Sequence, residues 1–348
     1  MHADESEARG RPSHSIRMSS HKHPSATSVI PFKTRSRCPH HALDLDNMAT
    51  AKRVLRDYDH VILDCDGVLY VNSTAVAGAA ETVNRLRGMG KKLVFATNSS
   101  IKSRSGLATK LTELGFRVRE SELFPSSYAA AVYLSSVRFP SHQKAFVVGM
   151  SGIVDELSAA GHQPVTDSDR NPDPHSAPQC HVRLRDDVGA VVVGYDNQFT
   201  FTKLTKACSY ASRPHCMLIC CNGDESFPSP DDRIINPGPG KLVSAIAAGT
   251  DKQFISIGKP TRMFFDLIMK ANPEMGRNRT IMIGDRLTTD IVFARTNGID
   301  SLFVQTGMQK LHDMHRYANS SDPLDWDKVP DYYAASLSTL LKYMTASA

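Results

Sequence analysis

The sequence has no uninterrupted apolar run that approaches the roughly 18 residues of a membrane-spanning helix. It has no Cys-x-x-Cys pair, and its seven cysteines are odd in number and irregularly placed. These absences argue against a zinc site and a disulfide framework and favour a reducing, cytoplasmic compartment. The formal net charge is only +5, which argues against a broad nucleic-acid-binding face. We therefore expect neither a nucleic acid nor a membrane as a partner.

The 348 residues are 41% hydrophobic and 22% charged, which is typical of a globular protein with two domains or one domain carrying an insertion. Residues 1–47 differ from the rest, because they are rich in Ser, His, Pro, Arg and Lys and have no sustained apolar periodicity. They predict a disordered N-terminal extension. After them, strand and helix patterns alternate, which predicts an α/β fold with a doubly wound, Rossmann-like parallel sheet.

The alternation is interrupted once. Residues 48–140 and 251–348 form one series of strands and helices, the predicted core domain, in which we include a strand at Gln253–Ile257. Residues 141–250 have strands and helices of their own, so we predict a smaller α/β domain, here called the inserted domain. Within it, Pro164–Asp187 is a long polar loop for which the sequence indicates no role.

Polar side chains follow four strands of the predicted core domain. They are Asp64 and Asp66, Thr97 and Asn98, Lys259, and Asp285 with Asp290. Because the carboxyl ends of parallel strands meet at one edge of a sheet, we expect these residues to lie together. A carboxylate can be phosphorylated, a lysine and a metal ion can neutralise the phosphoryl group, and a second carboxylate can move protons. Mg²⁺ prefers one or two carboxylates, which Asp64 and Asp285 can supply.

Four short segments of the chain together resemble a known family. They are residues 64–69 (DCDGVL), 97–98 (TN), 258–260 (GKP) and 284–291 (GDRLTTDI). They resemble the motifs of the haloacid-dehalogenase (HAD) superfamily, in particular its 4-nitrophenylphosphatase, phosphoglycolate phosphatase and pyridoxal phosphatase branch. One segment alone is a weak signal, whereas the four in this order are highly specific. The resemblance implies a HAD core with an inserted cap of the C2 type.

The resemblance also implies roles for the carboxylates. Asp64 would be the nucleophile and a Mg²⁺ ligand, and Asp66 would be the general acid and base and give its backbone carbonyl to the metal. Asp285 would be the second metal carboxylate, and Asp290 would support the site from behind these ligands. The implied reaction is hydrolysis of small phosphomonoesters through a phosphorylated Asp64.

For the phosphoryl oxygens, the resemblance implies contacts with Thr97 and Asn98 and charge neutralisation by Lys259. It places the substrate against four residues of the cap, which are Tyr195, Asn222, Asp224 and Phe227. Pyridoxal phosphatases of this branch have a histidine where this chain has Phe227, which weakens an assignment to pyridoxal 5′-phosphate.

The partner expected from this resemblance is a small phosphorylated metabolite, and a homodimer formed through the cap stays open. Two other readings also stay open. One is a catalytically weak relative that binds or regulates, and the other is a phosphomutase. A dehalogenase is disfavoured, because Asp66 supplies acid and base chemistry that displacement of a halide does not require.

Overall fold

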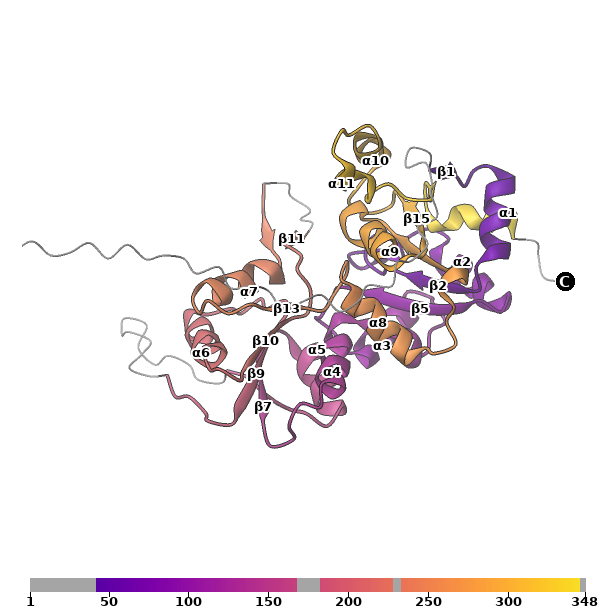
Figure 1. Ribbon diagram of the computed structural model, residues 1–348. Helices are drawn as coiled ribbons and strands as arrows, with labels where there is room; N and C mark the ends of the chain where they lie inside the picture. Colours follow the sequence, from indigo (N-terminus) through magenta and orange to yellow (C-terminus); the bar gives the residue numbers. More distant parts are fainter. Residues whose placement is uncertain (1–41, 168–181, 228–232, 345–348) are drawn as a thin grey trace, which may run out of the picture. The chain divides into compact units, whose positions relative to one another are not determined.

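The structure is a computed structural model that describes residues 42–167, 182–227 and 233–344. Most of the predicted N-terminal extension and the middle of the predicted polar loop lie outside these residues. The described chain forms two parallel sheets with helices packed on them (Figure 1).

The larger sheet has seven strands, all paired in parallel, in the order β1-β16-β15-β14-β2-β5-β6. Their bounds in that order are Leu43–Asp44, Tyr332–Ala334, Asp300–Val304, Thr280–Gly284, His60–Leu63, Lys92–Thr97 and Leu123–Pro125. Strand β2, an interior strand of this sheet, is buried along its whole length, as its continuous apolar sequence predicts.

Alternate residues of the central strands point to opposite faces of this sheet. Leu63 of β2 belongs to a buried cluster with residues of helices α1 (Met48–Asp57), α2 (Ala79–Gly88) and α3 (Arg104–Glu113). Ile62, the preceding residue, belongs to a second cluster with residues of α4 (Ser126–Ser136), α8 (Arg262–Ala271) and α9 (Val292–Asn297). Helices therefore cover both faces, and the predicted doubly wound α/β fold is confirmed.

The smaller sheet has five parallel strands in the order β13-β10-β9-β7-β8. Their bounds in that order are Ile255–Ser256, Met217–Cys220, Val188–Val193, Lys144–Val148 and Gln163–Val165. The helices of this part are α5 (Ser151–Ala159), α6 (Phe201–Ala211) and α7 (Pro239–Ala248). The antiparallel hairpin of β11 (Ser226–Phe227) and β12 (Asn236–Pro237) extends from it.

Strand β13 corrects one predicted boundary. The sequence places Gln253–Ile257 in the core domain, but Ile255 pairs with Ile219 of β10 in the smaller sheet. The backbone N–H groups of Ile257 and Gly258 donate to carbonyls at the end of β10, at 2.9 Å and 2.8 Å. The strand pattern shows that a strand is present but cannot show which sheet it joins. The smaller sheet therefore includes a strand beyond residue 250, where the sequence-based prediction ends the inserted domain.

Two further boundaries differ from the sequence-based prediction. Leu43 and Asp44, placed in the disordered extension, form strand β1 and pair with β16, and Asn47 caps helix α1 by accepting a hydrogen bond from Ala49 N at 2.9 Å. Strand β8 begins at Gln163, so the predicted loop starts later than Pro164. Strands of two or three residues are too short to show a periodic apolar pattern.

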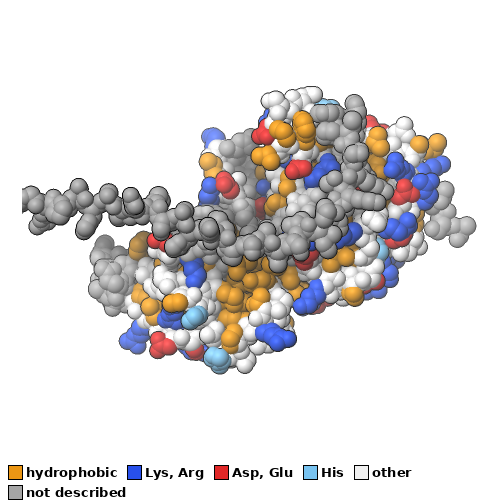
Figure 2. Space-filling model, in the orientation of Figure 1, with side chains coloured by type: hydrophobic (Ala, Val, Ile, Leu, Met, Phe, Trp, Pro, Cys, Tyr) orange, Lys and Arg blue, Asp and Glu red, His pale blue; other side chains and the backbone are white. Residues whose placement is uncertain are grey.

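Short elements complete the described chain. They are the hairpin of β3 (Tyr70–Val71) and β4 (Thr74–Ala75), α10 (Leu311–Ala318), α11 (Pro323–Trp326), the 3₁₀ segments Glu120–Glu122, Arg277–Arg279 and Leu337–Tyr343, and the π-helical turn Leu287–Ile291. None of the described helices combines the length and apolar character needed to cross a membrane. Basic and acidic side chains are interspersed over the face shown in Figure 2.

Candidate active site

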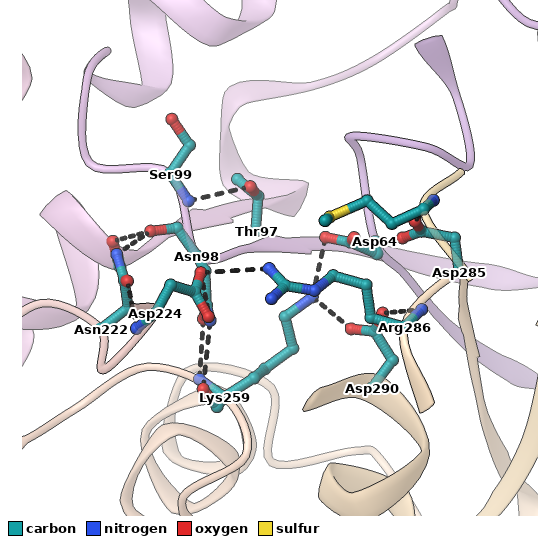
Figure 3. Close-up of polar contacts among 12 residues, drawn as sticks. Asp64, Thr97, Asn98, Ser99, Asn222, Asp224, Lys259, Asp285, Arg286 and Asp290 are labelled. Carbon is teal, nitrogen blue, oxygen red and sulfur yellow. Dashed lines mark hydrogen bonds and ion pairs between the residues drawn. The ribbon is translucent and has the colours of Figure 1, made fainter. Parts of the chain in front are cut away.

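The residues predicted to act together meet at the carboxyl ends of three neighbouring strands. Leu63 lies beside Phe95 of β5 and Ile283 of β14 in the sheet register, so the residues after these strands share one edge. A cavity of about 510 Å³ opens there. Six of the seven predicted core residues line it, namely Asp64, Asp66, Thr97, Asn98, Lys259 and Asp285. The seventh, Asp290, is fully buried beneath them (Figure 3).

Lys259 is the centre of this arrangement. Its ammonium donates to Asp64 Oδ1 and to Asp290 Oδ1, both at 2.7 Å, and the residue is only 2% exposed (Figure 3). Burial alone lowers the pKa of a lysine, but the carboxylates of Asp290 and Asp64 outweigh burial and raise the pKa of Lys259 above its usual value. A permanent positive charge therefore lies directly below the cavity.

The carboxylates outnumber this single ammonium. Oxygen atoms of Asp64, Asp285 and Asp290 lie within 4.8 Å of one another. Burial raises the pKa of Asp64 well above its usual value, although Lys259 opposes this effect. Burial, with a contribution from the charge of Asp290, raises the pKa of Asp285 to about 7. The carboxylates of Asp64, Asp285 and Asp290 repel one another, and a bound cation relieves this repulsion.

The carboxylate of Asp285 is held in one orientation. Its Oδ2 accepts a hydrogen bond from Met308 N at 2.9 Å, whereas its buried Oδ1 has no hydrogen-bond partner among the described residues. Gly67 and Gly307 approach so closely that a Cβ atom on either would overlap the Asp285 carboxylate. Gly67 also has a φ of +82°, which only glycine adopts readily. A fixed, unsatisfied carboxylate oxygen beside a second carboxylate fits a divalent metal ion.

Asp66 lines the cavity but is not part of this oxygen cluster. Its side chain is exposed to the cavity, and its Oδ2 accepts a hydrogen bond from Tyr70 Oη at 3.2 Å. The surrounding protein removes water from this carboxyl and raises its pKa. A carboxyl that faces a cavity and has a raised pKa is suited to donating a proton.

Thr97 and Asn98 occupy the predicted place but differ in what their side chains do. Thr97 lines the cavity, and its Oγ1 accepts a hydrogen bond from Ser99 N at 3.0 Å. The amide of Asn98 is engaged on both sides: Oδ1 accepts from Lys259 N at 2.8 Å, and Nδ2 donates to Lys259 O at 3.1 Å. The Asn98 side chain thus fixes the backbone that carries Lys259.

All four predicted residues of the inserted domain line the same cavity, namely Tyr195, Asn222, Asp224 and Phe227. The rings of Tyr195 and Phe227 meet edge to face with centroids 5.2 Å apart and form an aromatic wall. The Asn222 amide donates to Asn98 O at 2.6 Å, so Asn222 connects the segment after β10 of the smaller sheet to the segment after β5 of the larger sheet. Asp224 is buried and supplies a negative charge to the cavity wall.

Arg286 is a lining residue that the sequence-based prediction missed. It follows Asp285 directly, and its guanidinium reaches across the cavity to within 3.5 Å of Asp224 Oδ2 (Figure 3). Its position inside the fourth motif was a signal that could have drawn attention to it. A second cation beside Lys259 adds to the attraction of the cavity for an anion.

Comparison with known proteins identifies relatives that match most of this chain. Residues 61–163 match a family model described as haloacid dehalogenase-like hydrolase, and residues 256–340 match one described as HAD-hydrolase-like. Glycerol-3-phosphate phosphatase of Homo sapiens is 38% identical over 304 residues, 84% of this chain and 92% of the relative. Phosphoglycolate phosphatase 1A of Arabidopsis thaliana is 32% identical over 316 residues, 90% of this chain and 85% of the relative.

A solved structure is similar over most of the chain as well. Glycerol phosphate phosphatase from Mycobacterium tuberculosis, in complex with calcium, is 25% identical with a TM-score of 0.66, and the match covers 82% of this chain and 76% of that one. Its calcium shows that this structural relative binds a divalent cation.

Proposed function

The chain belongs to the haloacid dehalogenase-like hydrolases, and on that basis we propose that it hydrolyses small phosphomonoesters through a phosphorylated Asp64. The observation that carries this proposal is the contact of Lys259 with Asp64 and Asp290 at 2.7 Å, directly below a cavity that Asp66 and Asp285 also line. A nucleophile, a cation and an acid surround one cavity that is large enough for a small phosphate ester.

Asp64, Asp285 and the backbone carbonyl of Asp66 are the groups that we propose to hold Mg²⁺. The closely spaced carboxylates and the unsatisfied Oδ1 of Asp285 support this assignment. When bound, the ion supplies positive charge that balances the phosphoryl oxygens.

The residues of the chain then divide the reaction into two steps. A carboxylate oxygen of Asp64 attacks phosphorus, the bond to the leaving oxygen breaks, and Asp66 gives its proton to that oxygen. In the second step Asp66 takes a proton from water, the water oxygen attacks the same phosphorus, and inorganic phosphate leaves with Asp64 restored. Lys259 compensates the phosphoryl charge in both steps, and the Thr97 hydroxyl with the backbone N–H of Asn98 would hold the phosphoryl oxygens.

Compact metabolites are the substrates that this cavity favours. The relatives are named for glycerol-3-phosphate and phosphoglycolate, both of which are small enough for a cavity of about 510 Å³. The cavity lining contains both the aromatic wall of Tyr195 and Phe227 and the charged pair of Arg286 and Asp224, so the leaving group meets both an apolar and a polar surface. The cysteines at Cys65, Cys208, Cys216, Cys220 and Cys221 are free, which supports a cytoplasmic location.

The proposal is tested by phosphate release from glycerol-3-phosphate, phosphoglycolate, pyridoxal 5′-phosphate and 4-nitrophenyl phosphate. We expect turnover of at least one compact ester, with water as the acceptor. Transfer of the phosphoryl group to an added sugar would favour the phosphomutase alternative. No turnover of any ester would contradict the proposal and favour a binding protein.

Removal of metal should abolish this activity, because the clustered carboxylates then repel both one another and the substrate. With EDTA we expect no phosphate release, and with excess Mg²⁺ we expect full activity. Mg²⁺ at one hundred times its dissociation constant should also stabilise the fold by about 2.7 kcal/mol. Thermal unfolding of Asp285→Asn should show little of this stabilisation, and an undiminished Mg²⁺ effect in that variant would contradict the assignment.

Gly307→Ala should damage the metal site without removing a ligand. A Cβ atom at position 307 would overlap the Asp285 carboxylate and displace it. We expect activity and Mg²⁺ affinity to fall on the order of tenfold or more, the range seen when support for a metal ligand is lost. Gly276→Ala is the matched control, because a Cβ atom there meets nothing within 4 Å. Equal behaviour of the two variants would refute the proposed constraint on Asp285.

A further inference from the structure

The hairpin that follows the first motif brings the hydroxyl of Tyr70 within hydrogen-bond distance of Asp66, the proposed general acid. Tyr70 is the first residue of β3, and its Oη donates to Asp66 Oδ2 at 3.2 Å. The backbone holds this geometry independently of the hydroxyl, since Gly67 N donates to Tyr70 O at 2.8 Å. The tyrosine is 2% exposed, so its ring is fixed by packing. The hydroxyl therefore reaches Asp66 from a rigid support.

A lysine from a different element completes this contact. The ammonium of Lys110, in helix α3, lies 3.4 Å from the centroid of the Tyr70 ring. A cation over an aromatic face is attracted by the ring and withdraws electron density from it. The Tyr70 hydroxyl is consequently a stronger hydrogen-bond donor to Asp66. Lys110, Tyr70 and Asp66 form a chain of contacts that ends at the cavity.

We propose that Tyr70, supported by Lys110, is a positioning residue that orients Asp66 for proton transfer to the leaving oxygen. This inference rests on the proposed function. The hydrogen bond holds Oδ2, so the other carboxyl oxygen carries the proton that passes to the leaving group as the phosphorus–oxygen bond breaks. Without the hydroxyl, the Asp66 side chain can rotate in the cavity that it faces, and fewer encounters place its proton correctly.

The proposal makes a prediction that depends on the leaving group. 4-Nitrophenoxide leaves readily without a proton, whereas phenoxide is a much poorer leaving group and gains more from the acid. The two esters are similar in size, and kcat/KM reports only the steps up to formation of phospho-Asp64. An effect on the acid therefore appears as a change in the ratio of the two kcat/KM values, which a general loss of folded enzyme cannot produce.

In Tyr70→Phe we expect kcat/KM for phenyl phosphate to fall about tenfold, as for the loss of one useful hydrogen bond. For 4-nitrophenyl phosphate we expect a fall of less than about twofold, because a leaving group that departs unaided gains little from the acid. Lys110→Met should change the ratio in the same direction by a smaller factor. Asp66→Asn serves as the reference and should change it most, because it removes the acid itself.

Tyr58→Phe is the matched control. Tyr58 is another buried tyrosine whose hydroxyl donates to a carboxylate, that of Asp300, and it lies outside the residues that line the cavity. We expect its removal to leave the ratio unchanged. An equal fall for both esters in Tyr70→Phe, or no fall for either, would overturn the positioning role alone. A wild-type enzyme that hydrolyses neither these two esters nor any of the esters in the phosphate-release test would overturn the proposed function and this inference with it.

Discussion

Replacing Asp64 with asparagine abolishes phosphate release, while the protein stays folded. Asparagine has nearly the same shape but cannot form the acyl phosphate, so the nucleophile is lost together with one negative charge at the proposed Mg²⁺ site. Loss of the nucleophile from a set of catalytic residues that act together lowers kcat on the order of 10⁴-fold or more. Phosphate release and thermal unfolding, measured on the same preparation, separate loss of chemistry from loss of fold.

The matched variant for this experiment is Asp290→Asn. It also removes one carboxylate from contact with the Lys259 ammonium, but Asp290 does not line the cavity. We expect Asp290→Asn to retain measurable turnover and Asp64→Asn to have none. Turnover by Asp64→Asn at a rate similar to that of the wild type would refute the covalent role of this residue.

Lys259→Ala should have the second large effect. It removes the cation below the phosphoryl position, and loss of such electrostatic stabilisation costs on the order of 10²- to 10³-fold in kcat. It also leaves Asp64 and Asp290 buried without their common partner, and breaking a buried ion pair typically destabilises a fold by about 3–5 kcal/mol. Kinetics with saturating Mg²⁺, together with urea unfolding, measure the two effects separately.

Lys206→Ala provides the control for Lys259→Ala. Lys206, in helix α6, forms a similarly buried ion pair with Asp167 at 2.8 Å, away from the cavity. We expect Lys206→Ala to lose stability but to keep kcat within about twofold, because a substitution away from reacting groups removes no interaction made only in the transition state. A near-normal kcat in Lys259→Ala would mean that another cation, such as Arg286, neutralises the phosphoryl group.

The central residues of the site could be predicted from the sequence, because the ends of parallel strands lie at one edge of a sheet. A strand that ends in Asp64 and another that ends before Asp285 must meet at one edge of a parallel sheet, whatever separates them in sequence. The same reasoning placed Thr97 at this edge, whereas Lys259 follows a strand of the smaller sheet and still reaches Asp64. The chemistry of carboxylates beside a lysine then followed from the residue types alone.

Contacts that depend on side-chain direction or on pairing between domains could not be predicted in this way. The motif places Asn98 at the site, but only the structure shows that its amide binds the backbone of Lys259. Strand β13 has an ordinary strand sequence, and its membership in the inserted domain depends on pairing with β10. Tyr70 was part of the apolar run after the first motif, and no periodicity indicates that its hydroxyl meets Asp66.

The central claim is the phosphorylated Asp64, and acid quenching within the first turnover tests it most directly. The wild-type enzyme is mixed with 4-nitrophenyl phosphate and Mg²⁺, quenched in acid, digested and examined by mass spectrometry. We predict a phosphate group on the peptide that contains Asp64, labile to hydroxylamine as acyl phosphates are, and absent from Asp64→Asn. Rapid turnover with no phosphorylated peptide at any quench time, or phosphate on a different residue, would contradict the account.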